Sequence, residues 1–138
     1  MLILRTTNCA KQDRICLAGL IESMPNLLLI DPVGYLDFLR LTSDSALVMT
    51  DSGGIQEETT ILGVACMTLR ENTERPVTIT EGTNRLVHVT TDDIIDNYRS
   101  IRAADTAANH RVPPLWDGRA AERIVEIIAD HAAVATIA

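Results

Sequence analysis

Nine consecutive residues, Thr50-Asp51-Ser52-Gly53-Gly54-Ile55-Gln56-Glu57-Glu58, combine hydroxyls, glycines and carboxylates in an order that suits binding of a phosphorylated molecule. They follow a short apolar run and open a segment that ends at Gly63, which predicts a strand, a tight turn and a helix. The first backbone N–H groups of a helix are unpaired and lie at the positive end of its dipole. The Ser52 hydroxyl and the amides of Gly53 and Gly54 can therefore hold one phosphate. The alternative is a glycine turn that only packs the strand against the helix.

Glu58 is the candidate for a second contact with the same ligand. It lies six residues after Ser52, which at the helical rise is about 9 Å along the axis. A carboxylate at the mouth of the helix would repel a phosphate, whereas one at this distance can accept hydrogen bonds from a ribose. The side chain of Glu57 is expected to point about 100° away from that of Glu58 and to be solvated.

Arg75 stands in a long polar segment, Arg70–Asn84, within the tetrapeptide Thr73-Glu74-Arg75-Pro76. Loops of this length usually serve a function. Arginine keeps its charge and can bind two oxygens at once, so Arg75 is a candidate second clamp on the ligand. A surface ion pair, for example with Glu74, is the alternative.

Phe38 belongs to a third polar segment, Asp31-Pro32-Val33-Gly34-Tyr35-Leu36-Asp37-Phe38, which also follows a predicted strand. Its ring could stack beside a flat base. An aromatic residue at helical spacing can equally belong to the core, and both interpretations stay open on the sequence.

The remaining side chains suggest no metal, cofactor or acid–base site. His88, His110 and His131 are scattered, without a second histidine or a cysteine at ligand spacing. No pair of carboxylates and no histidine–nucleophile arrangement stands out. We therefore expect no catalytic residue in this chain, which is suited to holding a nucleotide and poorly equipped to transform it.

Composition narrows the class of protein further. The 138 residues suffice for one domain, and the net charge of −7 without a basic run argues against nucleic-acid binding. No apolar run is long enough to span a bilayer, so no membrane association is expected. The odd number of cysteines, at spacings that match no zinc site, predicts reduced thiols in a cytoplasmic protein. These cysteines are Cys9, Cys16 and Cys66.

Apolar runs and helical periodicities alternate along the chain. The predicted strands are Leu2–Leu4, Leu27–Ile30, Ala46–Thr50, Val64–Leu69 and Arg85–Val89. The predicted helices are Ala10–Ser23, Gly34–Ser43, Gly54–Leu62, one capped by Thr91, and one capped by Asp117 with Ala120, Ile124, Ile127 and Ile128 on its buried face. Uninterrupted apolar strands are typical of strands covered on both faces. This pattern predicts an α/β fold, a Rossmann-like parallel sheet with helices on both faces and a ligand at the carboxyl ends of its strands.

Four blocks in the same order and spacing resemble the non-hydrolysing UDP-N-acetylglucosamine 2-epimerases of bacteria, from about Asn26 to Ile128. The blocks are Asp31-Pro32-x-x-Tyr35-x-x-Phe38, Thr50-Asp51-Ser52-Gly53-Gly54-Ile55-Gln56-Glu57-Glu58, Thr73-Glu74-Arg75-Pro76 and Glu81-Gly82-Thr83-Asn84-Arg85-Leu86-Val87. The ending Trp116-Asp117-Gly118-x-Ala120-Ala121-x-Arg123-Ile124 also looks like the last helix of that family.

The resemblance implies the C-terminal half of a GT-B fold, in which two Rossmann-like domains face each other across a cleft. It implies a UDP site in which Phe38 and the backbone near Val33 border the uracil. Glu58 would bind the ribose and Arg75 would reach the diphosphate or the sugar. The diphosphate itself would be held by Ser52, Gly53 and Gly54.

The family interconverts UDP-GlcNAc and UDP-ManNAc through elimination and re-addition of UDP, for cell-envelope polysaccharides. Its proton-transfer acids lie in an N-terminal domain that this chain is expected to lack, together with the first strand and helix of the C-terminal domain. Residues 1–138 are thus interpreted as a single, incomplete nucleotide-binding domain. The expected ligand is UDP or a UDP-sugar. The expected protein partner is an N-terminal half or another copy of the chain, since a missing strand leaves a sheet edge free.

Two alternatives to the epimerase remain. One is a stand-alone nucleotide-binding or assembly module without catalysis. The other is the donor half of a GT-B glycosyltransferase, although the string Asp-Ser-Gly-Gly-x-Gln-Glu-Glu favours the epimerase.

Overall fold

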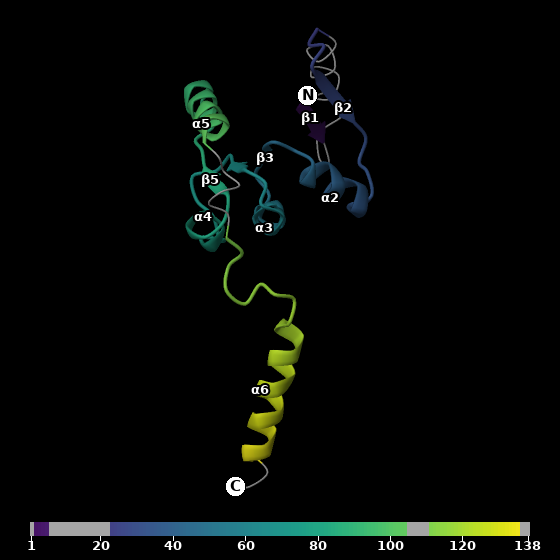
Figure 1. Ribbon diagram of the computed structural model, residues 1–138, viewed down its shortest axis with the longest axis vertical. Coiled ribbons are helices and arrows are strands. Elements are labelled where there is room, and N and C mark those ends of the chain that lie inside the picture. Colours follow the sequence, from purple (N-terminus) through teal and green to yellow (C-terminus); the bar gives the residue numbers. More distant parts are fainter. Residues whose placement is uncertain (1, 6–22, 105–110, 136–138) are drawn as a thin grey trace. The chain divides into compact units, whose positions relative to one another are not determined.

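The computed structural model describes residues 2–5, 23–104 and 111–135 (Figure 1). The chain divides into two compact units, Met1–Leu41 and Thr42–Ala138. Among the described helices, none combines the length and the apolar character needed to cross a bilayer.

The first unit contains a parallel pair of strands. Strand β1 (Leu2–Arg5) pairs with β2 (Leu27–Ile30) in a register that runs from Leu2 opposite Leu27 to Arg5 opposite Ile30. Both strands were predicted, but the expected cover on both faces is wrong for β2, where Leu28 is 45% exposed. The predicted helix Ala10–Ser23 lies outside the described residues except for its last position.

Helix α2 (Tyr35–Ser43) begins in the first unit and ends in the second. It matches the predicted helix to within one residue. The amide of Phe38 donates to the carbonyl of Gly34 at 2.9 Å, which places the first hydrogen bond of the helix after Asp31-Pro32. Proline disfavours helical geometry in the preceding residue, so the chain turns there before the helix starts.

The second unit is built on a three-stranded parallel sheet. Its strands are β3 (Val48–Thr50), β4 (Cys66–Thr68) and β5 (Asn84–Leu86), in the order β3-β4-β5. Val48 is opposite Cys66, and Cys66 is opposite Asn84. The central strand β4 is buried along its whole length. The apolar runs predicted all three strands, although each is shorter than the run that encodes it.

Helix α3 (Gly53–Leu62) follows β3 and contacts all three strands of this sheet. It ends at Gly63, whose φ of 69° is in the left-handed region that favours glycine, as predicted. Segment Arg70–Asn84, predicted to be a loop, contains the short helix α4 (Val77–Thr80). Pro76 stands directly before α4, and its φ of −59° is compatible with the start of a helix.

Helix α5 (Thr91–Ala103) is capped by Thr90 rather than by Thr91. The Thr90 hydroxyl oxygen accepts the backbone N–H of Asp93 at 3.2 Å. Two adjacent threonines offered the same capping chemistry, and the pattern placed the boundary one residue too late.

Helix α6 (Ala120–Ala135) departs from the prediction at its start and on its face. Asp117 accepts the backbone N–H of Arg119, so it closes the turn ahead of the helix instead of capping the helix. The predicted buried face is exposed, with Ile124, Ile127 and Ile128 at 55%, 57% and 62%. Periodicity identifies an amphipathic helix without specifying a surface that covers it.

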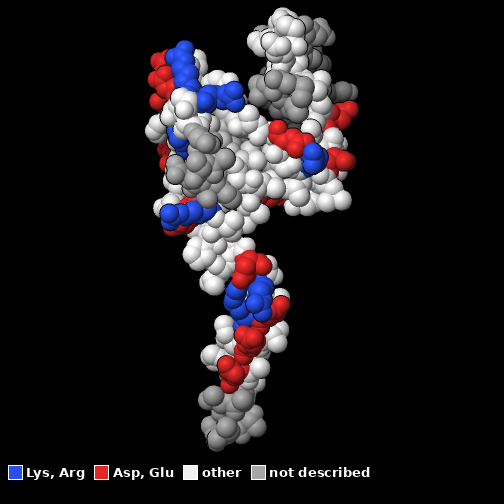
Figure 2. Space-filling model, in the orientation of Figure 1, with Lys and Arg blue, Asp and Glu red and all other residues white. Residues whose placement is uncertain are grey.

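Charged side chains of both signs mix near the start of α6 (Figure 2). Arg119 pairs with Glu122 at 2.7 Å, and Arg123 pairs with Asp117. All four side chains are exposed enough to be well solvated, so these pairs orient the turn more than they stabilise it.

The interior of the second unit is part apolar and part polar. Ala65, Met67, Val87 and Ile101 form its apolar cluster. The fully buried side chains also include Gln56 and several threonines of α3, β4 and α4. Most polar groups buried this completely are hydrogen-bonded, and their partners define the surroundings of the candidate site.

Candidate functional site

The turn between β3 and α3 presents open backbone at the start of the helix. Ser52 occupies the N-cap position with extended geometry (φ −87°, ψ 129°), and its side chain makes no capping hydrogen bond. The amide of Ser52 donates to Thr50 Oγ1 at 3.0 Å. The exposed Ser52 hydroxyl is therefore not committed to the helix that it precedes.

Gly53 and Gly54 face empty space. A Cβ atom built on either residue would meet no heavy atom within 4 Å. Neither residue has a positive φ, so the backbone conformation does not require glycine at these positions. Neither packing nor backbone conformation therefore explains the two glycines. Close approach of a ligand to the backbone would explain them, because a side chain would be in its way.

Glu58 lies further along α3 and is half-buried. Within the described ranges, its side chain has no hydrogen bond or ion pair with another residue. Its carboxylate is thus free to accept hydrogen bonds from a ligand.

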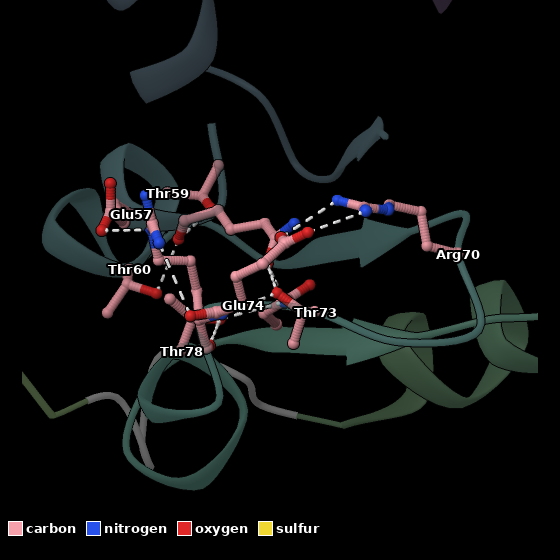
Figure 3. A network of polar contacts seen from close by, with 10 residues as sticks. Glu57, Thr59, Thr60, Arg70, Thr73, Glu74 and Thr78 are labelled. Atoms are coloured by element: carbon pink, nitrogen blue, oxygen red, sulfur yellow. Dashed lines mark hydrogen bonds and ion pairs between the residues drawn. The ribbon is translucent and has the colours of Figure 1, made fainter. Parts of the chain in front are cut away.

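Arg75 reaches α3 through Glu57. The two side chains form an ion pair with 2.8 Å between Arg75 Nε and Glu57 Oε1, and both are about half exposed. Glu57, expected to be solvated, is thus partly exposed but also ion-paired. Arg75 thus forms a surface ion pair, the alternative given for it, but its partner is not Glu74. The Glu74 carboxylate binds the Arg70 guanidinium instead, at 3.0 and 3.2 Å (Figure 3).

The buried side-chain amides of Gln56 and Asn84 were not predicted from the sequence. Gln56 Oε1 accepts from Thr73 Oγ1 at 2.6 Å and from Asn84 Nδ2 at 3.2 Å. The Asn84 amide also donates to Thr78 Oγ1 at 3.1 Å, and its oxygen accepts from Thr68 at 2.6 Å. Figure 3 shows this network between α3 and the segment that carries Thr73 and Thr78.

A signal for this network was present in the sequence. Gln56, Thr59 and Thr60 stand at i, i+3 and i+4, so they share one face of α3. All three are fully buried. A polar stripe at helical spacing beside a long polar loop indicates that the loop packs on that face.

Gly82 is closely packed, whereas Gly53 and Gly54 have open space where a side chain would be. A Cβ at Gly82 would lie 2.4 Å from Thr60 Oγ1 and 2.6 Å from the Thr78 carbonyl oxygen. Glycine here lets the chain after α4 lie directly against α3, which keeps the Arg75 segment on the helix.

Cys66 and Phe38 lie outside this group of residues. Burial raises the pKa of the Cys66 thiol, against the effect of hydrogen bonds with Thr59 and Thr68, so the thiol is neutral and unsuited to nucleophilic attack. Cys9 and Cys16 fall outside the described residues. Phe38 is half-buried on α2 in the first unit, and its assignment to a base stays a prediction.

The structure thus brings together, in one unit, five of the six residues predicted to bind a ligand. They are Ser52, Gly53, Gly54, Glu58 and Arg75. An unpaired helix start, a free carboxylate and a nearby arginine can bind a molecule that carries both phosphate and hydroxyl groups. Within the described ranges, His, Cys, Asp and Glu side chains form no cluster of three or more that could hold a metal ion.

Residues 2–129 match the family model described as UDP-N-acetylglucosamine 2-epimerase. The chain belongs to the UDP-N-acetylglucosamine 2-epimerase family. Among curated relatives, it is 43% identical over 112 residues to the UDP-N-acetylglucosamine 2-epimerase of Methanocaldococcus jannaschii. It is 38% identical over 109 residues to the enzyme of that name from Escherichia coli strain K12.

The matched segments cover 78% and 77% of this chain but only 29% of each of these two relatives. The chain therefore spans only about a third of the length of such epimerases.

Solved structures of the family share the fold. The Methanocaldococcus jannaschii UDP-GlcNAc 2-epimerase in complex with UDP-GlcNAc and UDP aligns with a TM-score of 0.78 and 37% identity, over 92% of this chain and 35% of that one. The Neisseria meningitidis UDP-GlcNAc 2-epimerase bound to UDP-GlcNAc aligns with a TM-score of 0.77 and 32% identity, over 93% of this chain and 36% of that one. The fold is thus α/β and Rossmann-like, and it corresponds to part of the GT-B-like fold of these epimerases, as expected.

Proposed function

We propose that this chain supplies the UDP-binding half of a non-hydrolysing UDP-N-acetylglucosamine 2-epimerase, an isomerase. The reaction interconverts UDP-GlcNAc and UDP-ManNAc through elimination and re-addition of UDP. Membership of the epimerase family supports this proposal, as do the two relatives solved with UDP-GlcNAc bound.

The observation that carries the proposal is the open helix start at Gly53 and Gly54. A diphosphate placed there would accept hydrogen bonds from the glycine amides and the uncommitted Ser52 hydroxyl. Glu58 would accept hydrogen bonds from the ribose, and Arg75 would bind phosphate or sugar oxygens. Phe38 would border the uracil.

Binding of UDP to the 138-residue chain, measured by titration calorimetry, tests this site. We expect Ser52→Ala and Glu58→Gln each to weaken binding by about 1–3 kcal/mol, through loss of hydrogen bonds with phosphate and ribose. Glu126→Gln on α6 is the matched control, because it removes the same charge outside the turn. Unchanged affinity in both site variants would refute the assignment.

Catalysis is tested separately, with UDP-GlcNAc in heavy water. Epimerisation through proton removal at C2 should incorporate deuterium at that carbon. We propose that proton transfer depends on groups of an N-terminal half or of another copy of the chain. The exchange should therefore appear when the N-terminal half of a relative is added. Binding of UDP without deuterium incorporation, whether the N-terminal half is present or absent, would favour a nucleotide-binding module without catalysis.

The proposal includes a cytoplasmic location, which a free Cys66 thiol suits because disulfides are rare in reducing compartments. Products of this reaction would serve the synthesis of cell-envelope polysaccharides.

A further inference from the structure

The backbone of Arg75 is held on both sides by threonine hydroxyls. Its N–H donates to Thr73 Oγ1 at 3.0 Å. Its carbonyl oxygen accepts from Thr78 Oγ1 at 2.7 Å and from the Thr78 amide at 3.0 Å. The peptide groups that flank Arg75 are therefore fixed although its side chain is half exposed.

The two threonines are in turn bound to buried amides. Thr73 donates to Gln56 Oε1 on α3, and Thr78 accepts from Asn84 Nδ2 on β5. Gln56 and Asn84 also bind each other, at 3.2 Å. A shift of Arg75 relative to α3 would break the partly buried hydrogen bonds that Thr73 and Thr78 donate, and unpaired polar groups are costly where water is scarce.

The next residue of α3 holds the side chain of the same arginine. Glu57 Oε1 forms the ion pair with Arg75 Nε, which leaves the terminal guanidinium nitrogens for other contacts. Arg75 Nη1 is 3.5 Å from the Glu74 carbonyl oxygen, at the limit of a hydrogen bond. Consecutive residues Gln56 and Glu57 thus hold the backbone and the side chain of Arg75, respectively.

We propose that Gln56, acting through Thr73, and Glu57 are positioning residues that preorganise Arg75 for the diphosphate at the start of α3. This inference rests on the proposed function, because it assumes that Arg75 contacts the bound nucleotide. Preorganisation matters here since a long arginine side chain otherwise loses conformational entropy when it binds.

The amide of Gln56 suggests that this network is not arranged for stability alone. Gln56 Nε2 is buried and has no hydrogen-bond partner among the residues that the structure describes. A buried unpaired donor is destabilising, so an apolar residue would suit a purely structural role better. The oxygen of the same amide is needed to fix Thr73.

The test compares Thr73→Val with Thr73→Ser by calorimetry with UDP. Valine keeps the shape of threonine but removes both hydrogen bonds of its hydroxyl, so UDP affinity should fall about tenfold as Arg75 loses its fixed position. Serine retains the hydroxyl and should restore affinity to within about twofold. In the Arg75→Ala background, Thr73→Val should have no further effect, because the two changes act through one contact.

Thr59→Val is the matched control. It removes a buried hydroxyl that bonds to carbonyl groups of α3 and does not reach Arg75, so UDP affinity should stay at the wild-type value. An equal loss from Thr73→Val with and without Arg75, or no rescue by serine, would overturn the inference.

A second readout does not depend on UDP. In the free protein, nuclear magnetic resonance should detect a slowly exchanging Arg75 Nε–H, because Nε lies 2.8 Å from Glu57 Oε1 in an ion pair. The signal should be lost in Thr73→Val and Glu57→Gln and kept in Thr59→Val. Its persistence in Thr73→Val would refute the positioning role, whereas absence of UDP binding by the wild type would refute the proposed function instead.

Discussion

Asp117 is a carboxylate whose acidity is set by its immediate neighbours. The Arg123 guanidinium binds both of its oxygens, and the backbone N–H of Arg119 adds a bond of 3.0 Å. These donors, Arg123 foremost, lower the pKa of Asp117 from 3.8 to about 2. The charged form is therefore favoured in the folded state.

We expect Arg123→Gln to raise the pKa of Asp117 toward its ordinary value, as measured by titrating the carboxyl resonance. A depressed pKa means that the pair contributes to stability above the unfolded pKa of about 4 and that this contribution is lost as the pH falls toward 2. Arg119→Gln is the control, since it keeps the backbone N–H and Arg123. An unchanged Asp117 titration in Arg123→Gln would contradict the bidentate pair.

At the residue scale, the sequence predicted charges and turns better than buried amides. Ser52, Gly53 and Gly54 were recognisable because a glycine turn before a helix exposes a known set of backbone donors. Gln56 was not, because an amide has no charge and its role depends on Thr73 and Asn84, which are distant in sequence. A surface ion pair of Arg75 was among the alternatives, but its partner was not predicted, since Glu57 comes from another element.

At the scale of structural elements, the glycine near the start of α3 and the glycine after α4 differ in the space around them. Gly54 has open space around its missing side chain, whereas Gly82 has none. The same substitution should therefore affect stability and binding differently at the two positions.

Gly54→Ala should leave the free energy of unfolding unchanged or raise it by about 0.4–1 kcal/mol, while it weakens UDP binding by obstructing the amides. Gly82→Ala should lower the free energy of unfolding by about 1–3 kcal/mol, because the new methyl group overlaps Thr60 and the Thr78 carbonyl. Urea denaturation and calorimetry with UDP measure the two effects. Wild-type UDP affinity in Gly54→Ala would exclude the phosphate site.

Element boundaries show where local pattern stops being sufficient. The apolar runs located β3, β4 and β5, but their ends are set by the register with neighbouring strands. Helix α4 was missed because its four residues are too few to show a periodicity. The face of α6 was misjudged because burial depends on a second surface, which no local pattern contains.

At the scale of the whole molecule, the strands that the structure describes in the second unit are best protected from solvent at β4. This strand is fully buried and bonded on both sides, whereas the apolar face of α6 is exposed. Local stability follows such differences in burial.

Hydrogen exchange followed by mass spectrometry should therefore find the slowest amides in β4 and the adjacent strands, and much faster exchange throughout α6. Helix α5 provides an internal reference, because Ile101 anchors it in the apolar cluster. Protection of α6 equal to that of β4 would mean that its apolar face is covered in solution.

The mixed interior of the second unit has a thermal consequence. Exposure of apolar surface on unfolding raises the heat capacity, whereas exposure of polar surface lowers it. Gln56, Asn84 and the buried threonines make up much of this interior. Melting of the unit should thus show a heat-capacity increment below the usual value of about 12–15 cal/mol/K per residue. The free energy of unfolding would then vary less with temperature. On cooling, the unit would lose less stability than a domain of the same size with an apolar core.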